Sequence, residues 1–199
     1  MPIRLNGSTS GHIELAAPAV AGSTTLELPT DSIKPGLVLV AQESFTTQST
    51  VSVDDCFTSE YDNYRLFFSL TSASTTASAY LRLRASGSDI TSAHYAQMSP
   101  GLTSGNAVSS SGNGGQTAWE WGTINTAGMA SIFFDVLLPH VSTETRIGGA
   151  SSYYNGSVGI GRAIQGFLDN STIVDGVTFY PGSGNYTGSL SIYGYRSTL

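Results

Sequence analysis

The sequence predicts an all-β protein, an antiparallel jelly-roll-like β-sandwich that follows an N-terminal β arm. Three observations predict this class. Apolar residues recur with a period of two or in short runs, and the helical period is nearly absent. Clusters of Gly, Ser and Asn separate these segments. Hydrophobic residues make up 40% of the chain, enough for a folded core, although only 11% of the residues are charged.

The expected strands are short segments with alternating or continuous apolar residues, bounded by turn residues. In chain order they are His12–Leu15, Thr24–Leu28, Leu37–Ala41, Thr50–Val53, Tyr64–Leu70, Ala79–Ala85, Ala118–Trp121, Ser131–Leu137, Arg146–Tyr153, Ala163–Leu168, Ile173–Tyr180 and Ser189–Tyr195. We expect the intervening segment Met98–Gln116 to be a mobile surface loop, because Ser and Gly dominate it and little in it can pack.

Residues 1–35 are predicted to form the arm, and residues 36–199 the sandwich domain. In the arm, "HIEL" and "TLEL" alternate apolar and acidic residues, and the segment between them contains Pro18 and Gly22, which suit a turn. Two such short strands cannot form a core alone. We therefore expect a hairpin whose buried side is supplied by the main domain or by another chain, as in an assembly arm.

The charge and hydropathy of the chain argue against nucleic-acid and membrane partners and favour self-association. The net charge of −6 argues against a nucleic-acid-binding surface, because affinity for phosphates is largely electrostatic. No segment approaches about 18 consecutive apolar residues, so membrane insertion is not expected. Lys34 is the only lysine, whereas surfaces of monomers usually carry many. A homo-oligomer, a homotrimer in particular, is the expected state.

The N-terminal stretch "LNGSTSGHIELAAPAVAGSTTLELPT" resembles a segment of tail-fibre-like and other virion structural proteins of tailed bacteriophages, notably cyanophages and other marine phages. In those proteins a "GQVL" strand usually follows, and "KPGLVLVAQ" stands in its place here. The later stretches "FTSEYDNYRLFFSL" and "SLSIYGYRS" are similar to the β-rich C-terminal domains of such proteins. Together these similarities span most of the chain.

The resemblance implies a non-enzymatic protein located in the virion. The first expectation is a tail fibre or receptor-binding subunit that attaches to tail or baseplate proteins through its arm. The alternative is a capsid decoration (cement) protein that binds the major capsid protein and stabilises the head. The resemblance supplies no catalytic residues.

Aromatic residues are the candidates for contact with a receptor or a host surface glycan. Trp119 and Trp121 share one face of an expected strand. Core packing is their ordinary role, and a sugar-binding platform is the alternative. Tyr153 and Tyr154, beside Asn155 at a strand end, are the pair expected to be exposed.

Tyr80, Arg82 and Arg84 alternate with apolar residues, so they share the other face of their strand. They are either a solvated face with local acidic partners or a subunit interface, where arginine forms bidentate pairs.

No residue pattern predicts catalysis, a cofactor site or a metal site. The three histidines, His12, His94 and His140, match no zinc-binding spacing. Cys56 follows two aspartates, which should raise its pKa and oppose thiolate chemistry. The carboxylates from Asp54 to Asp62 match no EF-hand spacing, and turn or strand-edge positions are their ordinary role.

Overall fold

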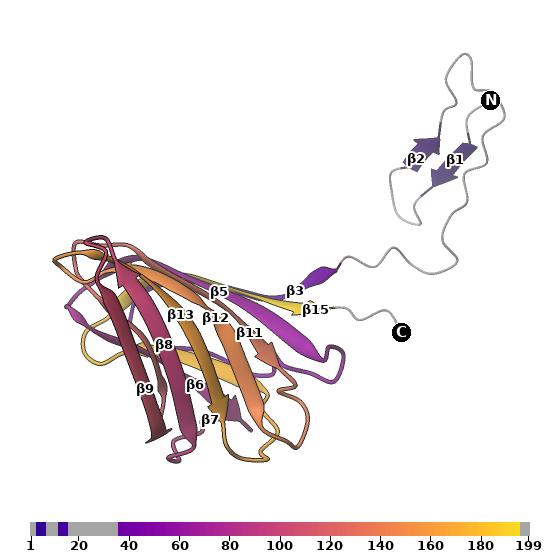
Figure 1. Ribbon diagram of the computed structural model, residues 1–199. Coiled ribbons are helices and arrows are strands. Elements are labelled where there is room, and N and C mark those ends of the chain that lie inside the picture. The colour runs from indigo at the N-terminus through magenta and orange to yellow at the C-terminus, as the bar shows by residue number, and fades with distance from the viewer. Residues whose placement is uncertain (1–2, 7–11, 16–35, 196–199) are drawn as a thin grey trace. The chain divides into compact units, whose positions relative to one another are not determined.

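The chain divides into two compact units, Met1–Lys34 and Pro35–Leu199. A computed structural model describes residues 3–6, 12–15 and 36–195 (Figure 1). In the first unit, β1 (Ile3–Asn6) and β2 (His12–Leu15) form an antiparallel pair with Ile3 opposite Leu15. The expected strand at His12–Leu15 is present, and it pairs with β1. The expected strand Thr24–Leu28 lies outside the described residues.

The second unit is an antiparallel β-sandwich of two unequal sheets (Figure 1). The larger sheet has eight strands, in the order β3 (Leu37–Gln48), β15 (Tyr186–Tyr195), β5 (Asn63–Ala73), β11 (Ala130–Leu137), β12 (Thr145–Tyr154), β13 (Gly159–Leu168), β8 (Tyr95–Thr103) and β9 (Val108–Gln116). The smaller has five: β10 (Trp119–Ile124), β6 (Ala77–Ala85), β14 (Gly176–Pro181) and β4 (Val51–Val53), with β7 (Ser88–Asp89) paired to β6.

The prediction of an all-β sandwich is confirmed. The strand order does not establish a jelly-roll connectivity, which stays a prediction. Among the described residues no helix is long and apolar enough to span a membrane.

Alternation along the strands decides which side chains enter the space between the sheets. In β5, Tyr64, Leu66 and Phe68 are completely buried, whereas Phe67 between the last two is exposed. The same period of two places Leu81 and Leu83 of β6 in the core. Because each sheet has one apolar face, burying both faces against each other gives the two-layer architecture.

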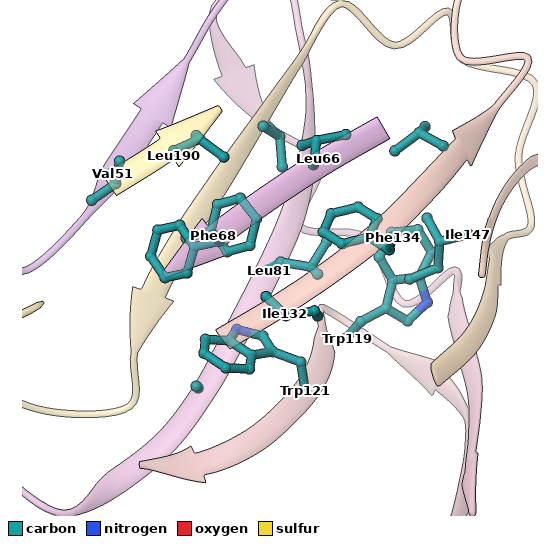
Figure 2. Packing of buried hydrophobic residues seen from close by; sticks show 14 of the residues in the cluster. Val51, Leu66, Phe68, Leu81, Trp119, Trp121, Ile132, Phe134, Ile147 and Leu190 are labelled. Atoms are coloured by element: carbon teal, nitrogen blue, oxygen red, sulfur yellow. The ribbon is translucent and has the colours of Figure 1, made fainter. Parts of the chain in front are cut away.

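Aromatic rings from the two sheets meet at the centre of the core (Figure 2). Phe68 of the larger sheet stacks on Phe179 of the smaller one, with ring centroids 4.1 Å apart and an interplanar angle of 5°. Phe45 stacks on Phe68 at 5.3 Å, and Trp121 meets it edge-on at 5.9 Å. These rings join β3, β5, β10 and β14 into one packed unit.

At one edge of the smaller sheet, a side chain of β8 makes the hydrogen bonds that a neighbouring strand would otherwise make. The buried amide of Gln97 accepts a hydrogen bond from the backbone N–H of Glu120 at 2.7 Å and donates one to its carbonyl at 3.0 Å. Nearby, the indole N–H of Trp119 donates to the carbonyl of Ala96 at 2.9 Å. Edge backbone groups of β10 are thereby satisfied without a further strand, as buried polar groups require.

The segment Met98–Gln116 was expected to be a mobile loop, and this prediction is wrong. It completes β8, turns at residues 104–107, and returns as β9 in register with β8, with Leu102 opposite Val108. Tyr95, Gln97 and Ser99 of β8 alternate into the core. Strand β9 then needs only backbone hydrogen bonds to β8, which Ser and Gly provide as well as any residue. Poor β-propensity is overridden by this pairing.

Replacing Phe68 with alanine should lower the free energy of unfolding by about 3–5 kcal/mol, because it removes a ring packed from both sheets and leaves a cavity. Urea denaturation monitored by tryptophan fluorescence measures this loss. Phe67→Ala, on the opposite side of the same strand, is the matched control and should cost clearly less in dilute protein. Equal losses in the two variants would contradict the assignment of the core.

Candidate functional site

The larger sheet turns one face away from the smaller sheet, and we call it the outer face. Large apolar side chains remain exposed on it, in contrast to the usual polar solvent-facing side of an antiparallel sheet. They are Leu37, Leu39, Phe67, Met98, Leu102, Val108, Phe133, Leu137 and Phe167. Clustered exposure of this kind marks an interaction surface on a folded domain.

Strands β5 and β11 carry the raised part of the outer face. Phe67 and Phe133 lie directly opposite each other in the register, with ring centroids 6.3 Å apart. Tyr193 of the neighbouring β15 meets Phe67 edge-on at 5.9 Å. The three rings contact one another along the face, yet Phe67 and Phe133 are still 41% and 42% exposed. We call Phe67 and Phe133 the aromatic ridge.

The adjacent strands β12 and β13 present small residues on the same face. Gly148 and Ala150 of β12 lie opposite Gln165 and Ala163 of β13. A Cβ atom at Gly148 or Gly161 would meet no other atom within 4 Å, so the space above them is open. We call Gly148, Ala150, Gly161 and Ala163 the small-residue floor.

Two hollows lie on the outer face, beside the exposed side chains of β8 and β9. One, of about 860 Å³, is bounded by Met98, Arg146 and Phe167 among others. The other, of about 690 Å³, is bounded by Leu102, Val108 and Ala163 among others. We call the two hollows the trough: Gly148 lines the first, Gly161 and Ala163 line the second, and both are lined by residues of β8, β12 and β13.

Charges on the outer face are neutralised in pairs. The guanidinium of Arg65 on β5 donates two hydrogen bonds to Asp135 on β11, at 2.8 and 2.7 Å, and the hydroxyl of Tyr195 donates a third at 2.7 Å. Partial burial works to raise the pKa of Asp135, but the hydrogen bonds from Arg65 and Tyr195 outweigh it, so this pKa lies below its usual range. At the edge of the trough Arg146 pairs with Glu144 at 2.6 Å.

A second polar cluster lies on the smaller sheet, on the side away from the core. Here Arg84 contacts Asp54 at 2.6 Å and also pairs with Asp89, so it ties β6 to the segments around it. Arg82 lies 3.7 Å from Asp89 and donates to the carbonyl of Thr117 at 2.9 Å. Both arginines of the predicted interface strand therefore have local acidic partners.

Tyr80, the third residue of that candidate interface, stacks on Tyr180 of β14 at 5.4 Å. The guanidinium of Arg82 lies 4.8 Å from the centre of the Tyr180 ring. Tyr80, Arg82 and Arg84 are all half-buried and engaged within the chain. An interface role for them is neither required nor tested by these contacts.

The structure does not bring the candidate glycan contacts together on a surface. Trp119 and Trp121 are both completely buried, so a sugar platform on them is ruled out and core packing is their role. Tyr153 was expected to be exposed, and this prediction is wrong, since only 4% of it is accessible. Tyr154 is exposed and Asn155 is half-buried, its Oδ1 accepting from the backbone N–H groups of Ser157 and Val158.

The burial of Tyr153 follows from its position in β12. It shares the inward parity of Ile147 and Ser151, both buried, whereas Tyr154 takes the outward parity. Its ring lies against Gly122, where a Cβ would come within 2.8 Å of it, and the Arg162 guanidinium lies 5.8 Å from its centre. The alternation of the predicted strand contained this signal, because counting from Ile147 by twos reaches Tyr153.

Histidine, cysteine and acidic side chains are scattered over the described residues rather than gathered at one metal site. In that part of the chain, no group of three or more His, Cys, Asp or Glu side chains lies close enough to hold a metal ion. Burial is the main cause that raises the pKa of Cys56 to about 12, and the neighbouring aspartates add less. Its sulfur lies within 3.6 Å of the carbonyl of Val53.

Tyr153→Ala should lower the free energy of unfolding by about 3 kcal/mol or more, because it empties a buried aromatic site beside Gly122. Tyr154→Ala, one residue further and exposed, is the matched control and should change it by less than about 1 kcal/mol. Thermal melts of the two variants give the comparison. A similar small change in both would mean that Tyr153 lies on the surface.

The Arg65–Asp135 pair should make stability depend on acid. The folded-state pKa of Asp135 is depressed, so its pairing with Arg65 stabilises the folded chain above about pH 4. This stabilisation is lost as the pH falls through the folded-state pKa of Asp135. The Tm difference between the native chain and Asp135→Asn should therefore be largest near neutral pH and narrow below about pH 4. The Tm difference between the native chain and Arg65→Gln, which lacks the partner of Asp135, should narrow in the same way. A difference that stays constant with pH in both variants would contradict the pairing.

Comparison with known proteins adds no family. No protein-family model matches the chain, and no curated protein matches it in sequence. Among solved structures, one similarity is to a structure of E230A-fructofuranosidase from Schwanniomyces occidentalis complexed with fructosylnystose, at 8% identity and a TM-score of 0.23. It covers 96% of this chain and 38% of that one, so this chain spans well under half of the enzyme's length. A TM-score at this level carries no argument about fold or activity.

Proposed function

We propose that this chain is a non-enzymatic structural protein of a tailed-bacteriophage virion, a tail fibre or receptor-binding subunit that joins the particle through its N-terminal arm. The observation that carries the structural role is the outer face, where apolar side chains of six strands lie exposed on one side of an otherwise well-packed domain. Such a face serves association with protein, and it offers no cluster of acid, base and nucleophile for chemistry.

The division of the chain supports the proposed role of the arm. The unit Met1–Lys34 contains the β1–β2 pair, whose register places Arg4 opposite Glu14 and Leu5 opposite Ile13. Two four-residue strands are too short to be stable alone in water. An attachment segment gains its stability when a neighbouring protein covers it. The virion location itself rests on the resemblance of residues 5–30 to phage virion proteins.

Labelling of intact particles tests this function. An antibody raised against residues 36–199 should decorate the tail tips of the phage that encodes the chain, as seen by electron microscopy with gold labels. A particle assembled with a chain that lacks residues 1–35 should lose the label, because the arm provides the attachment.

Label spread over the head would replace the fibre role with capsid decoration. Absence of the protein from purified particles, checked by mass spectrometry, would refute a virion role altogether.

A further inference from the structure

We propose that two copies of this chain pair through their outer faces about a two-fold axis that runs parallel to the strands, between β11 and β12. This deepens the proposed function by naming the partner of the outer face, and it does not depend on whether the particle carries the protein on its head or its tail. The partner is a second copy because the face is complementary to itself.

The middle of the larger sheet is the line between β11 and β12. Four strands lie on each side of it, β3, β15, β5 and β11 on one and β12, β13, β8 and β9 on the other. A two-fold axis along this line places β11 of one copy over β12 of the other, and β5 over β13. The aromatic ridge of each copy then lies over the small-residue floor of the other, as a self-complementary two-fold interface requires.

Register makes this match residue by residue. One row across the sheet runs from Phe67 to Phe133, Ala150 and Ala163, all direct neighbours in the strand pairing. Rotation about the axis keeps each residue at its height along the strands. Phe133 of one copy therefore faces Ala150 of the other, and Phe67 faces Ala163. Each large ring meets an alanine, which is how interdigitated sheet faces fill their space.

The next row contains the charges. It runs through Arg65, Asp135, Gly148 and Gln165. The rotation sets Asp135 over Gly148 and Arg65 over Gln165, where the amide can bond the guanidinium. Since Arg65 and Asp135 already neutralise each other within one copy, the pairing buries no unpaired charge in this row.

The size of the face suits a stable pair. Seven strand spacings and strands of about 27 Å give it an area of roughly 900 Å², close to the about 800 Å² per partner that standard interfaces bury. Packed sheets cross at about 30°, so facing residues of the two copies align best near the axis and less well toward the edges of the sheets. The four strands nearest the axis carry the row of Phe67, Phe133, Ala150 and Ala163, so this row is the best aligned.

Multi-angle light scattering of the full chain gives the first test. The expected mass is twice 20.8 kDa at a protein concentration of about tens of micromolar, because interfaces of this size have Kd values that range from micromolar to picomolar. Ala163→Arg fills the floor without touching the core and should give the monomer mass. Thr172→Arg, on an exposed loop, is the matched control and should leave the pair intact.

A monomer mass for the native chain overturns the proposal. A mass of three times 20.8 kDa supports instead the homotrimer that the sequence predicts. Retention of the pair in Ala163→Arg, with its melting temperature unchanged, assigns the contact to another surface.

A cysteine pair tests the geometry directly. Within one chain, Phe67 and Ala163 lie three strands apart, about 14 Å by strand spacing, beyond the reach of a disulfide. Between paired copies they face each other twice. Packed sheets lie about 10 Å apart face to face, which is also too far for a direct disulfide, so a short bismaleimide is used to bridge the two thiols. The double variant Phe67→Cys with Ala163→Cys should give a covalent dimer on a denaturing gel after this treatment, and each single variant should remain uncrosslinked.

Crosslinked ladders would indicate a head-to-tail contact and overturn the two-fold pair, as would an uncrosslinked double variant. Because virion labelling is measured separately, failure of the pairing and failure of the virion role are distinguishable.

Discussion

Stacking between Phe68 and Phe179 is the contact on which the sandwich depends. Their rings lie 4.1 Å apart and parallel, and each comes from a different sheet. Phe45 and Trp121 then pack on Phe68, so rings from four strands share one centre. Burial of these rings contributes strongly to the hydrophobic free energy that holds the two sheets together. The two sheets pack face to face because this arrangement removes these rings from water.

The same alternation that fills the core also creates the outer face. Each strand of the larger sheet must send every second side chain away from the core, and at Phe67, Phe133 and Leu102 that side chain is apolar. Soluble sheets ordinarily place polar residues at such positions. Here the polar part of the face includes Ser, Gln and two internally neutralised ion pairs. A surface with this composition gains free energy when protein covers it, which links the packing of the domain to its proposed role in assembly.

Polar contacts in the interior complete the structure where strands end. Gln97 satisfies both backbone groups of Glu120, and the hydroxyl of Tyr95 accepts from the backbone N–H of Leu83 and donates to the carbonyl of Ile90. Each replaces a missing strand at the edge of the smaller sheet. Such buried polar side chains cost little when fully paired and a great deal when one partner is lost. They fix how the two sheets meet along this edge.

The sequence by itself determined the fold class and most of the strands, because alternation is a local property that needs no knowledge of neighbours. It also contained the burial of Tyr153, through its parity with Ile147. Strands β8 and β9 were decided only in the tertiary structure, since backbone pairing with β13 and between themselves outweighs the poor β-propensity of Ser and Gly. The outer face was likewise invisible in the sequence. Phe67 and Ala163 stand far apart in the chain, and only the order of strands places them in one row on the same surface.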